Sequence, residues 1–522
     1  MASTYPARAG QIARAAGTVM IFFVASRVAG LAREVIIGAR FGTGTELDAY
    51  LAAFRLPDIL FQLVAGGALA SAFLPTFSGY LVRNDRAGAD RLASAVINLL
   101  LLALSVLAIL AALLAPFLVR AVIAPGFSPE QQALTASLMQ GMLLSTVVFG
   151  ISGVVMAMLN AYQHFLLPAL APVVYNLAII AGAWFLAPRW GVRGLVMGVI
   201  AGAAGHLAVQ MPEVARRGWR WSPVLGLHEA GVREVGRLMG PRVLGLAAVQ
   251  LNFLVNTILA SGLAAGSLAA LNYAWLLMLL PQGIVAQAIA TAAFPTFATL
   301  AARHERAALR AVLSSTLRGI VFLAMPATVG LIILREPLIR LLLQRGAFDE
   351  HSTAAVAHAL AFYAAGLLAH SVVEVVARAF YALHDTRTPV LVGLAAMVGN
   401  VLLSLLLIRP LGFGGLALAN TLATTAEMAA LLWLMRERLA GLEGHRLGAT
   451  VARSALASGA LALVLIGWMN RMGEGSAWIA GAGGLMVGAF VYGGTAFIMG
   501  AEEIKEAIRL VQRADLHLPR ET

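Results

Sequence analysis

The sequence contains no cysteine and only one lysine, Lys505, among its 522 residues. The absence of cysteine excludes disulfide bonds, thiolate metal sites and thiol-based catalysis. Charged residues are also scarce, at 12%, whereas a soluble domain typically has about 25%. The sequence has no nucleotide-binding P-loop, no HExxH motif and no GxSxG motif, so it gives no support for ATP-driven transport or hydrolytic chemistry.

Hydrophobic residues make up 60% of the chain, and the mean hydropathy is +0.85. A soluble domain has roughly 45–50% apolar residues, so this chain has more apolar surface than one water-soluble core can bury. Apolar runs of about 20 residues, long enough to cross a hydrocarbon core of about 30 Å, recur from end to end. The sequence therefore predicts an all-α polytopic membrane protein with about 14 transmembrane helices. The predicted spans are 12–38, 47–80, 93–122, 132–161, 166–187, 191–212, 232–262, 268–300, 311–344, 353–383, 387–408, 412–435, 448–470 and 477–500.

The net charge of +12 comes almost entirely from arginines that are scattered between the apolar runs. A nucleic-acid-binding protein would gather such charges on one soluble face, so nucleic acid is not an expected partner. With the N-terminus inside, cytoplasmic segments hold about 21 Arg and Lys residues and the outside loops about nine. This asymmetry predicts a multi-pass protein with both termini in the cytoplasm. The first apolar run lacks a convincing cleavage site and is expected to remain as a helix.

An internal repeat organises the chain. Residues 81–87 read LVRNDRA and residues 301–307 read AARHERA, an offset of 220. Proline, glycine and charged loop positions stay in register over more than 100 residues, which chance similarity between apolar segments does not easily produce. Further pairs at offsets of 220 or 221 are Pro75 and Pro295, Pro168 and Pro389, and Gly191 and Gly412.

The repeat unit holds six spans, an even number, so its two copies have the same orientation in the membrane. Parallel repeats are a known transporter architecture, with the site between the halves near the midplane. We therefore expect an N-lobe at 1–222, a C-lobe at 223–440, two further helices at 441–500 and a cytoplasmic tail at 501–522. The start of the tail, 501–513, has the pattern of a short amphipathic helix.

The first two spans carry a high density of charge for helices in a membrane. A charge at the bilayer centre costs at least about 2.5–3.5 kcal/mol, so such side chains normally face a partner or an aqueous cavity. One interpretation is a cationic, water-accessible cavity, which requires an anionic substrate, because guanidinium groups bind phosphate oxygens bidentately and stay charged when desolvated. The alternative is internal ion pairing that only holds helices together. The residues concerned are Arg27, Arg33, Glu34, Asp48, Arg55 and Asp58.

Other polar residues within the spans are weaker candidates. Glu374 and Arg378 are spaced as an i,i+4 pair, and Arg318 and Arg453 lie near enough to span ends to snorkel. A cluster on the spans 387–408 and 412–435 could supply oxygen ligands to Na⁺ or form hydrogen bonds between helices. The cluster consists of Asn400, Ser404, Asn420, Thr421 and Thr424.

Three stretches of this sequence resemble a known family. Residues 26–80 begin SRVAGLAREVIIGARFGTGTELDAYLAAFRLPD, residues 239–297 begin MGPRVLGLAAVQLNF, and residues 380–390 read FYALHDTRTPV. They resemble the MurJ/MviN lipid II flippases of the multidrug/oligosaccharidyl-lipid/polysaccharide exporter superfamily.

The resemblance implies two six-helix lobes around a central cationic cavity, with the last two helices forming a groove for a lipid tail. It implies transport of lipid II, the undecaprenyl-diphosphate-linked disaccharide-peptide, from the inner to the outer leaflet of the bacterial cytoplasmic membrane. Such a protein is not an enzyme and needs no cofactor, and Na⁺, H⁺ or the membrane potential drives it. Its expected partners are lipid II, membrane lipids and the cell-wall synthesis machinery.

Residue by residue, Arg27 and Arg33 match the essential arginines of the family's first helix, and Asp48 and Arg55 match the charged positions of its second. Two departures stand out. Phe61 follows the RLP turn where many members have arginine, and Leu276 stands where they have arginine in the eighth helix. Either Arg242 substitutes for these charges, or the substrate differs. The alternatives are an exporter of another lipid-linked glycan or anionic solute, and a non-transporting scaffold of the cell-wall machinery.

Overall fold

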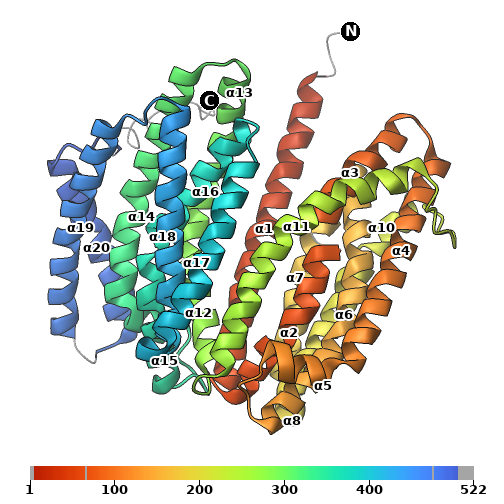
Figure 1. Cartoon of the computed structure of the whole chain (residues 1–522), viewed down its shortest axis with the longest axis horizontal. Helices are drawn as coiled ribbons and strands as arrows, with labels where there is room; N and C mark the ends of the chain where they lie inside the picture. The colour runs from red at the N-terminus through yellow and green to blue at the C-terminus, as the bar shows by residue number, and fades with distance from the viewer. Residues whose placement is uncertain (1–4, 65–66, 473–474, 504–522) are drawn as a thin grey trace, which may run out of the picture. The chain divides into compact units, whose positions relative to one another are not determined.

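The structure is a computed structural model that describes residues 5–64, 67–472 and 475–503. Its described part is built of helices joined by short connections (Figure 1). Two compact units divide the chain. The first consists of Met1–Ala269 with Arg345–Phe348, and the second of Ala270–Gln344 with Asp349–Thr522. The lobe limits expected at 222 and 440 were derived from the sequence repeat, and they differ from the limits of these two units. They stay a prediction.

The helices of the first unit come from one continuous stretch of chain. They are α1 (Tyr5–Phe41), α2 (Thr45–Val64), α3 (Gly67–Val82), α4 (Arg86–Leu113), α5 (Ala115–Leu118), η1 (Val119–Ile123), α6 (Pro129–Ala161), α7 (Leu166–Ala181), η2 (Gly182–Leu186), α8 (Ala187–Trp190), α9 (Val192–Ala208), α10 (Met211–Arg216) and α11 (Ala230–Ser261), where η marks a π-helical turn.

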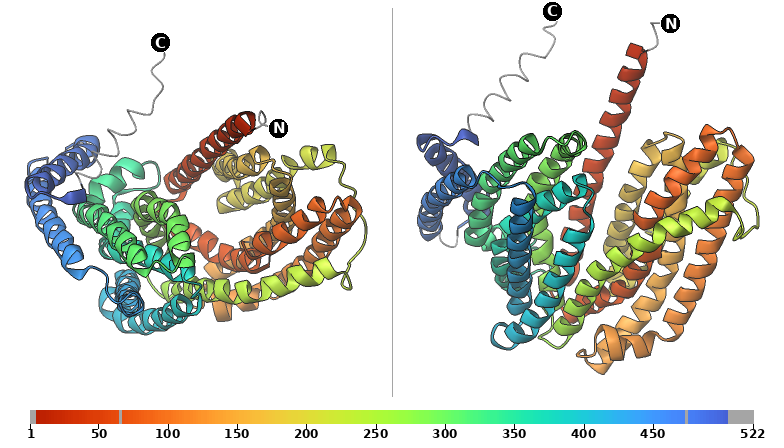
Figure 2. Two further views of the ribbon diagram at one scale, coloured as in Figure 1. Left: turned by 90° about the horizontal axis from the view of Figure 1, so that it is seen from above. Right: turned by 45° about the horizontal axis from the view of Figure 1, so that its top comes forward.

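The second unit contains the remaining helices, of which α12 begins three residues before the boundary. They are α12 (Ser267–Gln282), η3 (Gly283–Gln287), α13 (Ala288–Ala302), α14 (Arg306–Leu342), α15 (Glu350–Ala365), α16 (Leu367–Ala382), α17 (Arg387–Leu411), α18 (Phe413–Arg438), α19 (Gly444–Met472), η4 (Ile479–Gly483) and α20 (Gly484–Ile498). The last two long helices, α19 and α20, pack against each other and against α14 (Figure 2).

The prediction of an all-α polytopic membrane protein is confirmed. In the part of the chain that the structure describes, each of the fourteen predicted ranges is mostly helical. Within the described residues, ten helices are long and apolar enough to cross a membrane, and the pair α15 and α16, bent by 45°, would make eleven. The other three ranges belong to α1, α2 with α3, and α11, which hold most of the charges predicted for the site. The count of fourteen spans stays a prediction.

The internal repeat predicted from the sequence is confirmed by the backbone. Asn84 and His304, 220 residues apart, both adopt left-handed conformations, with φ of 57° and 56°. Gln163 and His384, 221 residues apart, both have φ of 59°. Few non-glycine residues take positive φ, so their recurrence in register shows that the two copies end corresponding helices in the same way. The helix starts also correspond at 86 and 306, 129 and 350, 166 and 387, and 192 and 413.

Side-chain caps explain where several of these helices begin. Asp85 accepts a hydrogen bond from the backbone N–H of Gly88 at 2.8 Å, and Ser128 accepts one from Gln131 at 3.3 Å. In the second copy, Asp349 caps α15 from the position that corresponds to Ser128. Each oxygen satisfies one of the N–H groups that a helix start leaves without an intrahelical partner.

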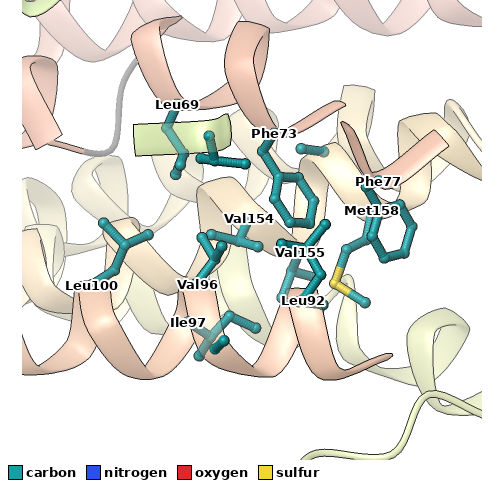
Figure 3. Close-up of a cluster of buried hydrophobic side chains, with 14 of the residues drawn as sticks. Leu69, Phe73, Phe77, Leu92, Val96, Ile97, Leu100, Val154, Val155 and Met158 are labelled. Atoms are coloured by element: carbon teal, nitrogen blue, oxygen red, sulfur yellow. The ribbon is translucent and has the colours of Figure 1, made fainter. Parts of the chain in front are cut away.

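Each unit has its own apolar core. In the first, α3, α4 and α6 enclose a cluster in which the Phe73 and Phe77 rings stack with centroids 5.1 Å apart (Figure 3). Tyr162 closes the end of this cluster with its ring edge on Phe77. In the second, Phe297 and Phe380 are fully buried between α13, α14 and α16. The first core includes residues of α11 and the second includes residues of α18, two of the helices that carry candidate site residues.

Candidate functional site

Arg33 links two helices of the first unit. Its guanidinium Nη1 donates to the side-chain oxygen of Asn176 on α7 at 3.0 Å, and its Nε donates to Glu34 at 3.1 Å. The amide nitrogen of Asn176 donates in turn to the carbonyl of Pro172 at 3.0 Å. With 26% of its side chain exposed, Arg33 is held in one orientation and stays partly accessible.

Arg27 lies almost two turns earlier on α1 and is exposed. Its guanidinium lies over the ring of Phe23, 5.2 Å from the ring centroid, which is cation–π geometry. An exposed guanidinium beside an aromatic ring is available to bind an anion. Arg27 and Arg33 therefore differ, because only Arg33 contacts a neighbouring carboxylate and an amide.

Two polar contacts join α2 to α11 within the first unit. The Nε of Arg55 donates to the Thr257 hydroxyl at 2.8 Å, and its guanidinium lies 5.5 Å from the ring centroid of Phe253. One turn further along α2, Asp58 accepts from the Gln250 amide at 3.1 Å. Thr257 and Gln250 are buried. The sequence does not predict these partners on α11.

Asp48 is 2% exposed and binds backbone groups. Its two carboxylate oxygens accept hydrogen bonds from the N–H groups of Gly266 at 2.7 Å and Ala269 at 2.8 Å. These donors belong to the start of α12, so Asp48 caps a helix from another segment of the chain. A negative charge is favoured there, because a helix N-terminus carries partial positive charge.

The structure thus contains one feature that each of the two interpretations of the charged spans expects. Glu34 neutralises Arg33 in an ion pair, as the internal-pairing alternative expects. Arg27, in contrast, has the exposure that an anion-binding role requires. The side chain of Arg242 lies outside the described residues, although its backbone belongs to α11. The substrate-binding assignment of Arg27, Arg33, Asp48, Arg55 and Arg242 stays a prediction.

Residues 37–481 match the sequence model of the family described as "Lipid II flippase MurJ". The chain belongs to this family. The resemblance predicted from its sequence is therefore confirmed. A relative from Burkholderia cenocepacia, named "Lipid II flippase MurJ", is 32% identical over 433 residues, which cover 81% of this chain and 84% of the relative.

Solved structures confirm the fold. The chain is similar to a structure described as "Lipid II flippase MurJ, inward closed conformation", with a TM-score of 0.79 and 24% identity, over 93% of this chain and all of the other. It is also similar to a multidrug resistance MATE family transporter of the MOP superfamily, with a TM-score of 0.68 and 16% identity, over 80% and 96%. The chain thus shares its fold with both of these transporters.

Phe61, at a position where the family resemblance implies an arginine in many members, lies in an aromatic cluster. Its ring centroid is 5.5 Å from that of Phe149, which lies 4.9 Å from Tyr175 and 5.3 Å from His206. His206 is also hydrogen-bonded to the Ser152 hydroxyl at 2.7 Å. The Phe61 ring is therefore packed against other aromatic rings of the first unit.

The candidate ion ligands on α17 and α18 have partners within the protein. The Asn420 side-chain oxygen is hydrogen-bonded to His370 at 3.1 Å, and Thr421 donates to the Phe362 carbonyl at 2.8 Å. Ser404 lies 3.5 Å from Asn400, and both are buried, as is Thr424. These contacts agree with the alternative that the cluster forms hydrogen bonds within the protein. Binding of Na⁺ by the cluster stays a prediction.

Two other charged groups within spans have well-defined partners. Arg378 pairs with Glu374 at 2.8 Å, as their spacing predicted. The expectation that Arg318 snorkels was wrong. Arg318 is 7% exposed and donates to Glu502 at 2.9 Å, so it pairs with a carboxylate of residues 501–503 within the protein. The rest of the predicted tail helix lies outside the described residues.

The second unit contains an apolar cavity of about 710 Å³ between α12, α14, α19 and α20. It adjoins the helices that the family resemblance assigns to a lipid tail. Aliphatic and aromatic side chains form nearly all of its wall, and Gly330 and Gly488 widen it. Other lining residues include Leu280, Phe322, Leu334, Leu461, Tyr492 and Phe497.

Proposed function

We propose that this protein flips lipid II from the inner to the outer leaflet of the bacterial cytoplasmic membrane for cell-wall synthesis. The observation that carries the proposal is the family match over residues 37–481, together with a relative of the same name that is 32% identical. The process is transport by alternating access and not an enzymatic reaction. Both chain termini lie in the cytoplasm, as the distribution of arginines favours.

The arginines of α1 and α2 bind the diphosphate of lipid II. Arg27 provides the exposed guanidinium, while Arg33 is oriented by Asn176 and Glu34. Phosphate oxygens favour such donors because the planar guanidinium makes paired, charge-assisted hydrogen bonds. Asp48 acts indirectly by capping the start of α12. Arg55 binds the diphosphate from α2, where Thr257 on α11 orients its guanidinium.

The apolar cavity of the second unit takes part of the undecaprenyl tail. A wall of leucine, phenylalanine, glycine and alanine side chains suits an isoprenoid chain, which has no polar group to satisfy. The volume of about 710 Å³ holds a segment of the tail, and the remainder extends into the bilayer.

Transport is coupled to Na⁺ or H⁺, and the α17–α18 cluster is the candidate ion site. Asn400, Thr421 and Thr424 bring oxygen atoms into a buried region of these helices. A coupled mechanism predicts that transport in proteoliposomes depends on an imposed Na⁺ or pH gradient. If Asn400→Ala and Thr421→Ala leave that dependence unchanged, the ion binds elsewhere.

The first experiment is rescue of a bacterium depleted of its own lipid II flippase. The wild-type protein and Arg27→Ala are compared at matched membrane abundance. We expect growth with the wild type and none with the variant. Rescue by both proteins would refute the role of Arg27 and keep the function, whereas failure of abundant wild-type protein to flip lipid II in proteoliposomes would refute the function.

The aromatic cluster at Phe61 favours a second candidate, export of another lipid-linked glycan or anionic solute. Phe61 and Leu276 remove two cationic positions that many members of the family have, and Phe61 is packed against Phe149. Flipping assays with lipid II and with other undecaprenyl-diphosphate-linked glycans separate the two candidates. A preference for the other glycan that Phe61→Arg reverses would support the second one.

A further inference from the structure

The connection between α10 and α11, residues 217–229, is an extended strap bound along α4 (Figure 1). The Asn98 amide donates to the carbonyls of Ser222 at 2.9 Å and Val224 at 2.8 Å. The Ser222 N–H donates to the Ser94 hydroxyl at 3.1 Å, and the Trp221 indole donates to the Asn98 oxygen at 3.0 Å. Four hydrogen bonds from two side chains therefore give this connection a defined path.

The strap lies on the side of α4 that continues as an apolar, exposed surface. Ser94 and Asn98 share a helix face with Leu102 and Ile109, which are 54% and 59% exposed. Residues 92–97 of the helix are buried on all sides, and beyond Asn98 this face is bare. The strap thus covers the first part of a surface that faces lipid along the rest of the helix.

The depth of the strap follows from the length of α4. A helix of 28 residues is about 42 Å long, so it exceeds a hydrocarbon core of about 30 Å. Ser94 and Asn98 lie about 12 and 18 Å from its first residue. The excess of about 12 Å puts the boundary between headgroups and acyl chains within about 12 Å of the first residue, so the part of the strap at Ser94 and Asn98 lies just on the acyl-chain side of this boundary.

The outer face of the strap matches this boundary in chemistry. Trp221 is 57% exposed, Leu225 44% and Leu227 57%. Beside them, the side chain of Arg216 is 80% exposed, and Arg220 is exposed as well. Tryptophan and leucine next to arginine are typical of segments that lie in a membrane interface and attract anionic headgroups.

We propose that residues 216–227 form an interfacial anchor that binds anionic phospholipid. Trp221, Leu225 and Leu227 insert among the acyl chains nearest the surface, and Arg216 and Arg220 contact headgroup phosphates. The arginines complement the charge of anionic headgroups, and the patch is continuous with the exposed apolar face of α4. Both features identify a lipid surface, and not a protein partner, as the occupant. The anchor is separate from the transported substrate, and its test needs no lipid II.

The absence of cysteine makes the first test clean. The single-cysteine variants Leu225→Cys and Leu227→Cys are each labelled with a nitroxide and reconstituted in vesicles of equal parts phosphatidylcholine and phosphatidylglycerol. Leu102→Cys is the lipid-facing control, and Arg83→Cys is the aqueous control. We expect the nitroxides at both strap positions to be more accessible to oxygen than to a water-soluble nickel relaxant, as is the nitroxide at Leu102→Cys. Labels that resemble Arg83→Cys would overturn the proposal and leave the patch as a protein-docking surface.

The second test addresses the charge. A polarity-sensitive fluorophore at Leu225→Cys reports titration of the detergent-solubilised protein with phosphatidylglycerol or phosphatidylcholine. We expect the apparent affinity for phosphatidylglycerol to fall about fivefold for each of Arg216→Gln and Arg220→Gln. The exposed pair Arg303→Gln and Arg306→Gln, in a loop of the second repeat, serves as the matched control. Equal losses from both pairs, or equal affinity for the two lipids, would overturn the proposal.

Discussion

The guanidinium of Arg33 on α1 and the amide oxygen of Asn176 on α7 are hydrogen-bonded at 3.0 Å. Asn176 was not identified from the sequence, although it is an isolated amide in an otherwise apolar span and lies four residues after Pro172. Its nitrogen is engaged by the Pro172 carbonyl, which orients its oxygen toward Arg33. Asn176 is therefore a positioning residue for the arginine that the sequence did identify.

The first prediction concerns this pair. Asn176→Leu removes the acceptor and leaves a partly buried guanidinium with one partner fewer. Since a hydrogen bond to a charged group contributes about 1.5–3 kcal/mol, we expect the lipid II flipping rate in proteoliposomes to fall about tenfold or more. Asn176→Asp keeps an oxygen acceptor and should retain more transport than Asn176→Leu. Equal rates for both variants and the wild type would show that this contact does not position Arg33.

A second prediction concerns the cap formed by Asp48. Asp48→Ala leaves the buried N–H groups of Gly266 and Ala269 without acceptors, at a cost of about 1–3 kcal/mol each. Asp48→Asn keeps one acceptor oxygen. The unfolding temperature in detergent should therefore be highest for the wild type, lower for Asp48→Asn and lowest for Asp48→Ala. Glu46→Ala, an exposed change on the same helix, is the control. If Glu46→Ala and Asp48→Ala unfold at the same temperature, the cap does not contribute to stability.

The sequence predicted what depends on periodicity and register. Helix positions follow from apolar runs, and the repeat follows from loop residues whose backbone recurs at Asn84 and His304. The identity of the site arginines on α1 and α2 was also predictable, because charge within an apolar run is rare. Their partners were not. Asn176 and Thr257 lie more than 140 residues away from Arg33 and Arg55, and only the packing of α7 and α11 brings them together.

The third prediction is a dependence of stability on pH through Asp385, which lies in the loop between α16 and α17. The Thr388 backbone N–H, followed by its hydroxyl and Arg438, holds the pKa of this carboxyl below its ordinary value. A carboxyl with a lowered pKa stabilises the folded state above its unfolded pKa of about 3.9, and this contribution is lost as pH falls through the folded pKa. The wild type should therefore lose more thermal stability than Asp385→Asn between about pH 5 and pH 3.

Thr388→Val provides the graded control for Asp385. It removes the hydroxyl donor at 2.7 Å and keeps the backbone donor at 3.0 Å. Its loss of stability on acidification should lie between those of the wild type and Asp385→Asn. Parallel acid profiles for all three proteins would show that other carboxyls dominate.

The fourth prediction decides whether Arg242 compensates for the two arginines that the family resemblance implies at Phe61 and Leu276. If it does, Arg242→Ala should abolish rescue of a flippase-depleted bacterium as completely as Arg27→Ala. Arg237→Ala, an exposed arginine earlier on α11, should rescue growth at the same abundance. Full transport by Arg242→Ala together with loss in Arg27→Ala would exclude compensation and favour a substrate other than lipid II.

The fifth prediction tests the apolar cavity as a site for the lipid tail. Gly330 lines the cavity, and a Cβ atom placed there would meet no atom within 4 Å. Gly330→Trp therefore directs an indole into the cavity without a backbone collision, and we expect it to reduce lipid II flipping strongly. Gly319→Trp is the matched control on α14, because its Cβ is equally free and it does not line the cavity.

A water-soluble analogue without the isoprenoid tail separates the cavity from the arginine site. Its binding, measured by calorimetry, should be unchanged in Gly330→Trp and lost in Arg27→Ala, because only the second change removes a phosphate ligand. A Gly330→Trp protein that flips lipid II at the rate of Gly319→Trp would show that the tail stays in the bilayer. In that case the cavity would have no part in transport, and the arginines of α1 and α2 alone would recognise the substrate.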